Sequence, residues 1–327
     1  MKILKHIINW TVWALVSLYV VVMIAIRIPR VQQYLGEKTA QVVGKKLGTK
    51  VEVRQIDLGF LNRLILDNVI IYDQQQQQMV NAARITARVD IASLAVGKIS
   101  ISSAQLFGAH LQLYKPTKDA QTNFQFALDS LASKDTTNHT PLDLRINSLI
   151  VRRSSVSYNQ LDEPKTPDKL NTKHLYIKDI SAHAILKALT DDSINVNLKR
   201  LSFTEPSGLS VKRLAFQLAA GRHDANLQNF LLQLPGTDIR IDSINATYQW
   251  EHFWKSLYMK GAISKTYITP ADLKCLVPEG KDYHHKIALT SNFSFDDYTL
   301  HVHNLQAMSD NGTIDLVTNG RIRMPEH

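Results

Sequence analysis

The chain has 327 residues, a net charge of +9 and 44% hydrophobic residues. This hydrophobic content is ordinary for a folded protein and excludes a disordered chain. A positive surface could bind anionic lipid headgroups or nucleic acid, and the charge alone does not choose between them. The one cysteine, Cys275, excludes an internal disulfide framework and any metal site built from several cysteines.

Residues 7–26 (IINWTVWALVSLYVVVMIAI) form a run without a formal charge. A helix needs about 20 such residues to cross the hydrocarbon core of a bilayer. A cleaved signal peptide is the alternative, but its apolar core would be shorter and followed by small residues, whereas Met23 to Pro29 reads MIAIRIP. We therefore expect residues 1–30 to form one uncleaved transmembrane anchor. Basic residues on its two sides nearly balance, and we favour a cytoplasmic N-terminus with the rest of the chain outside.

The next stretch, residues 31–48 (VQQYLGEKTAQVVGKKLG), spaces its apolar residues as on one face of a short amphipathic helix. Lys45 and Lys46 would lie in the last turn, and Gly48 would follow as the C′ residue. The helix could cap the end of a sheet or lie on the bilayer surface. Because its apolar stripe is modest, the pattern favours the cap.

From residue 49 to 327 the dominant pattern is alternation of apolar and polar residues. Residues 83–91 (ARITARVDI) are typical, with apolar side chains at every second position: Ile85, Ala87, Val89 and Ile91. Such alternation indicates a strand with one buried and one solvated face. Several runs change parity once in the middle, as at Asp242 and Ser243, which predicts β-bulges or bends.

Helical patterns are scarce after residue 49. NFQFALDSLASK (123–134) is one, and TPADLKCLVP (269–278) is another, with Thr269 as its N-cap and Pro270 at N1. The glutamines Gln74 to Gln78 are expected to form a polar hairpin loop. These helices are too few to cover a large sheet, and the strands do not alternate with helices as in a parallel βαβ fold.

The remaining folds are a sandwich, a closed barrel, or one long antiparallel sheet curled on itself. The alternating runs predict more than a dozen strands, which exceeds the roughly ten that a twisted open sheet carries without curling or splitting. We therefore expect a mainly β protein with a curled antiparallel sheet over residues 49–327.

Five short sequence patterns follow one another between residues 48 and 123. After the anchor and the helix come a G-x-x-V-x-V strand (48–53), an L-x-N-V-x-I-Y-D hairpin (66–73), a strand ending in Ser93-Leu94, a G-K-I-x-I-x-S strand (97–103), and a strand that leads to Asn123. This ordered set resembles the start of the AsmA-like proteins, and within them the TamB type. The resemblance covers roughly residues 1–130, and the rest of the chain matches only in its repeating strands.

The resemblance implies a single-pass protein of the bacterial inner membrane whose bulk lies in the periplasm. It implies a long U-shaped, taco-like antiparallel sheet with an apolar inner groove that carries phospholipid between the inner and outer membranes. An outer-membrane barrel protein of the BamA/TamA class is then a candidate partner, and nucleic acid is not. A single curled sheet has no second apolar layer, so acyl chains would satisfy its inner stripe at about 0.8 kcal/mol per buried methylene.

We expect the groove to be lined by the apolar side chains that occupy every second position of the alternating strands. The candidate residues are Ile85, Ala87, Val89, Ile91, Ile99, Ile101, Leu111, Leu113, Leu144, Ile146, Val196, Leu198, Ile239 and Ile241. Ordinary core burial inside a sandwich would explain the same periodicity equally well.

No catalytic constellation stands out, so we expect neither an enzyme nor a bound cofactor or metal. His301 and His303 share one strand face, with His284 and His285 near them in sequence, but solvent-facing histidines are much commoner than metal ligands in such a pattern. The alternative function is a scaffold for assembly or secretion of outer-membrane proteins, which would use exposed strand edges. A membrane-tethered enzyme acting on glycans is weaker, because no carboxylate pair stands out.

The alternation continues almost to His327, with one parity kept by Ile314, Leu316, Thr318, Gly320, Ile322 and Met324. Native sheets usually protect their edge strands, and this last run carries no such protection. We therefore expect the polypeptide to continue past His327 with further strands of the same kind.

Overall fold

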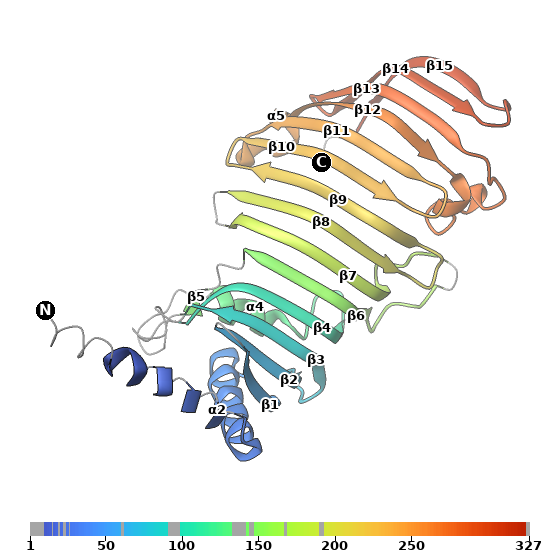
Figure 1. Ribbon diagram of the computed structural model, residues 1–327. Coiled ribbons are helices and arrows are strands. Elements are labelled where there is room, and N and C mark those ends of the chain that lie inside the picture. The colour runs from blue at the N-terminus through green and yellow to red at the C-terminus, as the bar shows by residue number, and fades with distance from the viewer. Residues whose placement is uncertain are drawn as a thin grey trace, which may run out of the picture. The chain divides into compact units, whose positions relative to one another are not determined.

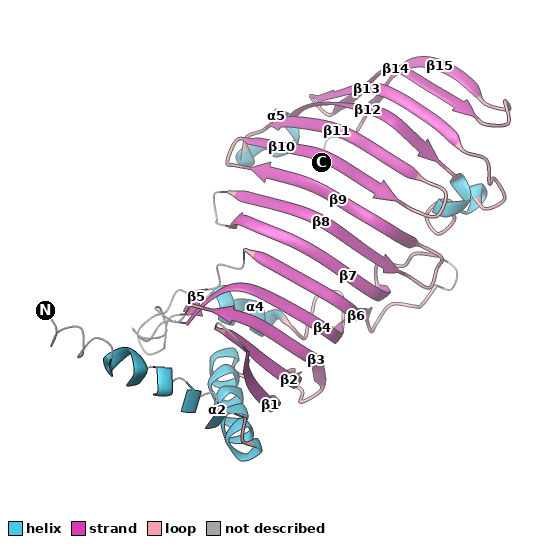
Figure 2. Cartoon of the chain, viewed as in Figure 1, coloured by secondary structure: helices cyan, strands magenta, loops and turns pink. Residues whose placement is uncertain are grey.

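The computed structural model describes residues 10–14, 16–18, 20–21, 24–25, 27–59, 62–90, 99–132, 142–143, 147–166, 169–189 and 193–324. It is mainly β (Figures 1 and 2). The strands are β1 (Val51–Gly59), β2 (Arg63–Tyr72), β3 (Gln78–Val89), β4 (Ile99–Lys115), β5 (Leu142–Asp143), β6 (Ser148–Gln160), β7 (His174–Leu189), β8 (Ile194–Thr204), β9 (Ser210–Ala220), β10 (Asp224–Gln233), β11 (Asp238–Thr247), β12 (Tyr258–Ile268), β13 (Ile287–Asp296), β14 (Thr299–Ser309) and β15 (Asp315–Arg323).

The helical elements are short apart from the first. They are α2 (Pro29–Leu47), α4 (Gln125–Ala132), α5 (Phe253–Ser256), and the 3-10 turns η1 (Trp250–His252), η2 (Pro270–Leu273) and η3 (Pro278–Gly280). The sheet has 15 strands in chain order, with the two-residue β5 paired to β4 off this path. Apart from the short parallel pairing of β5 with β4, the described pairings are antiparallel, which confirms the mainly β, antiparallel prediction.

Only part of the predicted anchor is described. Residues 10–14, 16–18, 20–21 and 24–25 are helical. Within the part of the chain that the structure describes, no helix combines the length and the apolar character that a membrane span requires. The other positions of the 7–26 run lie outside the described residues.

The chain forms two compact units, the first from residues 1–113 and 121–145, the second from residues 114–120 and 146–327. In the first unit, α2 packs along β1. It begins at Pro29, two residues before the predicted start, and ends as predicted, with Lys45 and Lys46 in its last turn. Gly48 takes the left-handed conformation (φ 69°) that suits a glycine C-cap.

A stripe of buried residues on α2 explains how closely it approaches β1. The stripe repeats every fourth residue: Gln32, Gly36, Ala40 and Gly44. A methyl group added at Gly36 would lie 2.8 Å from the carbonyl oxygen of Val53, and one added at Gly44 would lie 2.7 Å from that of Thr49. Gly36 therefore lets the helix rest on the backbone of β1, and Gly44 lets it approach the turn that leads into β1.

The face of β1–β4 toward α2 forms a hydrophobic core. Its buried members are Ala40, Val53, Ile56, Val69, Ala82 and Ala109. Half-buried side chains surround them, among them Leu35 of α2. The glutamine loop between β2 and β3 is a hairpin turn, as predicted, and the fully buried Asp73 orders it by accepting hydrogen bonds from the N–H groups of Gln75 and Gln77.

In the second unit the strands bend in their middles. Register shifts interrupt the pairing of β10 with β9 and of β11 with β12, the latter on both sides of Ile241. The second shift includes the parity change predicted at Asp242 and Ser243, which is confirmed as an irregularity. Non-glycine residues with positive φ lie at register shifts in β6, β7, β10 and β14: Arg153, Asp179, Asn229 and Asn304.

The bends keep apolar residues on one face of the sheet, although these residues change from even to odd positions, or the reverse, along the strand. Leu214 and Leu218 are four apart on β9, so they lie on the same face of the sheet. Their partners on β10, Leu232 and Leu227, are five apart. The one extra residue of β10 thus brings Leu227 and Leu232 to the same face.

The second predicted helix differs from expectation. Residues 270–273 and 278–280 form two 3-10 turns, not one α-helix. The Thr269 side chain does not cap the turn, because its hydroxyl donates to the carbonyl of Gly236 (3.0 Å). Asp272 accepts a hydrogen bond from the N–H of Gly236 (2.7 Å), so tertiary bonds to the β10–β11 turn replaced the local capping pattern. The first predicted helix, 123–134, is present as α4 over Gln125–Ala132; residues 123–124 form the turn before it, and residues 133–134 lie outside the described residues.

Candidate functional site

An apolar face crosses β8–β14 of the second unit. One row of directly paired residues, here termed the central row, consists of Val196, Leu218, Leu227, Ile244, Gly261, Phe293 and Val302. A second row, the margin row, lies two residues closer to one end of the strands: Ile194, Ala220, Ala225, Ala246, Met259, Phe295 and Leu300. Since residues two apart share a face, the two rows form one surface.

Gly261 is the one member of the central row without a side chain, and the ring of Phe293 occupies the space beside it. A methyl group at Gly261 would lie 2.6 Å from Cζ of Phe293 and 3.1 Å from Cγ1 of Ile244. The Phe293 ring therefore lies over the glycine and reaches toward the isoleucine. The apolar row continues through the position that has no side chain of its own.

The opposite face of the same strands is polar. The row between the central and margin rows contains Asn195, Ala219, Asn226, Asn245, Lys260, Ser294 and His301. Across it, the side-chain amide of Asn226 donates to Oδ1 of Asn245 (2.6 Å). The sheet of the second unit is thus amphipathic, with one face suited to water and one to apolar contacts.

Four predicted groove residues lie on this apolar face. Val196 and Leu198 are on β8, where Leu198 pairs with Phe216. Ile239 and Ile241 are on β11. All four are half-buried, and they pair only with apolar partners on β9 and β10, which places them with the central row.

The predicted residues of the first unit have a different environment. Ile85 and Leu111 pack against the core cluster that includes Ala40 of α2. Ala87 and Val89 are buried, and Val89 pairs with the half-buried Ile101. The remaining positions are the half-buried Leu113; Ile99, whose backbone is in β4 and whose side chain is not described; and Ile91, Leu144 and Ile146, which lie outside the described residues.

An aromatic segment between β11 and β12 covers one margin of the apolar face. Tyr248, Leu257 and Phe295 form a buried cluster there, and Phe253 of α5 packs against it. Burial raises the pKa of Tyr248, and the nearby charge of Asp224 adds to the effect. The sequence analysis missed this segment, although WEHFW at residues 250–254 concentrates three aromatic residues in five positions.

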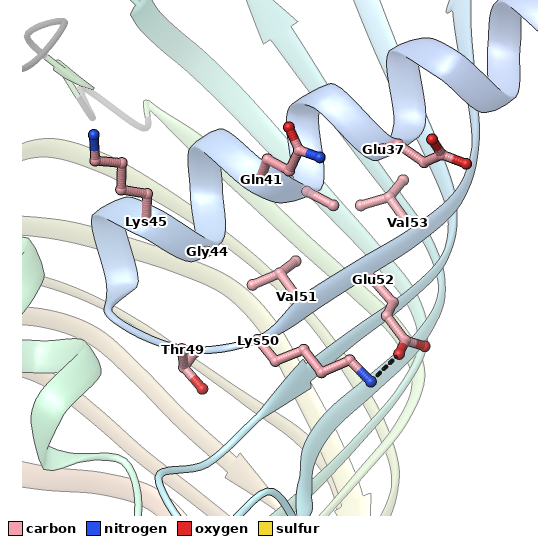
Figure 3. Close-up of a pocket in the computed structure, with 10 residues that line it drawn as sticks. Glu37, Gln41, Gly44, Lys45, Thr49, Lys50, Val51, Glu52 and Val53 are labelled. Carbon is pink, nitrogen blue, oxygen red and sulfur yellow. Dashed lines mark ion pairs between the residues drawn. The ribbon is translucent and has the colours of Figure 1, made fainter.

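A pocket of about 500 Å³ lies beside α2 and β1 in the first unit (Figure 3). Its polar lining includes Glu37, Lys45, Lys50 and Glu52. The ammonium of Lys50 lies 2.6 Å from Oε1 of Glu52, and its hydrogen bond holds the pKa of Glu52 below its usual value. This ion pair satisfies two of the lining charges, and nothing in the arrangement resembles a nucleophile with its base.

Two of the four histidines named in the sequence analysis each pair with a single carboxylate. His301 Nε2 lies 3.0 Å from Asp296, and His285 Nδ1 lies 2.9 Å from Asp310. Across the described ranges, no three residues of the types His, Cys, Asp and Glu gather as they would to hold a metal ion.

No protein-family model matches the chain, and no curated protein has a significantly similar sequence.

Proposed function

We propose that this protein carries phospholipid along the apolar face of its sheet. The observation that supports it is the pair of apolar rows, which run across seven strands of an amphipathic sheet. In the described part of the second unit, α5 lies at the strand ends, and η2 is hydrogen-bonded to the β10–β11 turn through Asp272. Acyl chains would remove the remaining apolar surface from water at about 25 cal/mol per Å².

The length of the face suits such a ligand. The spacing of about 4.8 Å between strands makes the rows from β8 to β14 about 29 Å long. One leaflet of a bilayer core is about 15 Å thick, so acyl chains laid along the face would have room for about two chain lengths. The site would bind by burial and shape, without a catalytic step.

The wider setting belongs to the same proposal. The sheet would curl into a U-shaped groove, and residues 1–30 would anchor it in the bacterial inner membrane, with the bulk of the chain in the periplasm. Phospholipid would then travel between the inner and outer membranes, with an outer-membrane barrel protein as partner. The resemblance of the N-terminal patterns to the AsmA-like proteins supports this setting.

A scaffold for outer-membrane protein assembly is the second candidate. The observation in its favour is the last strand, β15, where Leu316, Val317 and Ile322 are 47%, 70% and 60% exposed. An unpaired strand edge can accept a strand of another polypeptide or a further strand of its own chain. The two candidates differ in what contacts the protein: lipid on the apolar face, or polypeptide at the β15 edge.

Photo-crosslinking tests the proposal directly. A photoreactive amino acid would replace Leu227, on the apolar face, or its neighbour Gln228, on the polar face. In membranes of cells that make the full chain, we expect lipid adducts from position 227 and few from position 228. Equal labelling from both positions would refute a one-sided path, and polypeptide adducts from Val317 without lipid at 227 would favour the scaffold.

A charge placed on the face gives a second test. Leu227→Asp would put a carboxylate against acyl chains without a partner, which costs several kcal/mol. Native mass spectrometry of the protein would then detect less bound phospholipid than for Gln228→Asp. Equal lipid content in the two variants would contradict the proposal.

A further inference from the structure

Four aromatic rings form a continuous cluster at one margin of the apolar face. The Phe253 ring stacks on Trp250 (centroids 5.4 Å apart) and meets Trp254 edge-on at 5.3 Å. The Tyr248 ring lies 5.2 Å from Phe253 and 5.1 Å from Trp250. The indoles are therefore held against neighbouring rings and are not isolated side chains.

Hydrogen bonds fix the segment that carries these rings. The Ser256 hydroxyl accepts from the N–H of Gln249 (2.7 Å) and lies 3.2 Å from its carbonyl, which closes residues 249–256 into a loop at its base. The Tyr248 hydroxyl donates to the carbonyl of Gly221 (2.7 Å) and so ties the loop to the β9–β10 turn. These hydrogen bonds fix the position of the aromatic cluster at the strand ends.

The two sides of the cluster have opposite exposure. On the inner side, Phe253 packs against the buried cluster of Tyr248, Leu257 and Phe295, and Met259 of the margin row packs against the same cluster. On the outer side, Trp250 is 63% exposed and Trp254 is 55% exposed. Packed apolar side chains therefore lead from the exposed indoles to the margin row of the apolar face.

Indole has the chemistry of a lipid interface. Its ring is apolar, and its N–H donates a hydrogen bond, which is why tryptophan gathers where acyl chains meet headgroups. The opposite end of the same strands differs, because polar bonds of Thr269 and Asp272 hold the connection there to Gly236. The aromatic end is the one that offers an amphipathic surface.

We infer that Trp250 and Trp254 bind the interfacial part of a phospholipid, its glycerol ester and headgroup region, at the margin where acyl chains reach the apolar face. The inference rests on the proposed function and names the site where the lipid enters and leaves. Phe253 would contact the first part of the acyl chains, and the indole N–H groups would face the ester oxygens.

Tryptophan fluorescence tests the site, because the chain has only four tryptophans: Trp10, Trp13, Trp250 and Trp254. In the full-length Trp10→Phe/Trp13→Phe protein, the emission would come from the cluster alone. We expect phospholipid brominated near the ester end of its acyl chains to quench this emission, and unbrominated phospholipid to shift it to shorter wavelength. Loaded protein whose emission is neither quenched nor shifted would overturn the inference.

Lipid content separates this inference from the proposed function. Trp250→Ala/Trp254→Ala should lower the phospholipid found by native mass spectrometry, and Trp250→Phe/Trp254→Phe, which keeps a ring on Phe253, should lower it less. Tyr176→Ala is the matched control, because Tyr176 is 45% exposed and its ring lies under the Lys178 ammonium, away from the cluster. Bound lipid without quenching would refute the tryptophan site alone, whereas no lipid in the parent protein would refute both proposals.

Discussion

The two units use the same alternating strands for different kinds of burial. In the first unit, α2 packs along the sheet, and Val53, Ile56, Val69 and Ala82 are 7%, 3%, 3% and 0% exposed. In the second unit, the central row is half-buried, and its described helical turns lie at the strand ends. Nine of the 16 buried apolar residues described belong to the first unit, although the second is the larger.

The difference shows what a period of two can and cannot establish. Alternation places apolar residues on one face of a strand, and it says nothing about what touches that face. Ile85 and Val196 have equivalent sequence patterns, yet Ile85 packs against a core that includes α2, and Val196 lies in an apolar row of the other unit. The covering element has to be found elsewhere in the chain.

The largest expected effect is a loss of stability when a core side chain is truncated, and we compare the buried Ile56 with the half-buried Leu227. Ile56→Ala should destabilise the first unit by about 2–5 kcal/mol, because Ile56 is buried and the surrounding side chains would only partly fill the cavity left by the truncation. Leu227→Ala should cost the second unit about half as much, because less apolar surface is removed from contact. Hydrogen exchange measured separately for the two units would give both values, and equal costs would show that the second face is covered as completely as the first.

A smaller change tests how α2 covers the first unit. Gly36→Ala should destabilise it by about 1–3 kcal/mol, because the new methyl group meets the Val53 carbonyl and the helix must move away. Val42→Ala is the control on the same helix, since Val42 is 58% exposed and should change little. If thermal unfolding gave the two variants the same stability, the close approach of α2 would not support the core.

A single hydroxyl tests how firmly the aromatic segment is held in the second unit. Tyr248→Phe removes the hydrogen bond to the Gly221 carbonyl and should lower the free energy of unfolding by about 0.5–1.5 kcal/mol, since water would replace the lost donor. The ring contacts should survive, so tryptophan emission should stay close to that of the parent. A large change in emission would mean that the hydroxyl, and not the stacking, orders the cluster.

The smallest effect depends on pH and concerns the β10–β11 hairpin. Hydrogen bonds from the Arg240 guanidinium hold the pKa of Asp238 below its ordinary value of 3.8, with a further bond from Gln233. A lowered pKa in the folded state stabilises the hairpin above the unfolded value, and this contribution disappears as the pH falls through the folded pKa. In Asp238→Asn the free energy of unfolding should therefore fall less steeply below about pH 4 than in the parent protein. If the two proteins lost stability equally with falling pH, this contribution would be ruled out.

Much of the fold could be predicted from local patterns. Strand positions, the end of α2 at Gly48 and the glutamine hairpin all depend on neighbouring residues, and each is present. The structure of residues 269–280 could not be read this way, because Thr269 and Asp272 bind Gly236, 33 and 36 positions away. The aromatic cluster was missed for a related reason: its packing on Phe295 depends on strand register, which alternation alone does not give.

The order of the strands has a consequence for how such a protein can lengthen. Most strands of the main path are joined to their sheet neighbours by short connections, so closing these pairs costs little chain entropy. Stability then accumulates along the chain from nearest neighbours, as in repeat proteins. Duplication or loss of one hairpin would change the sheet by about 10 Å and preserve both faces, so genetic changes in whole hairpins could adjust the span of the molecule while every other pairing remained as it was.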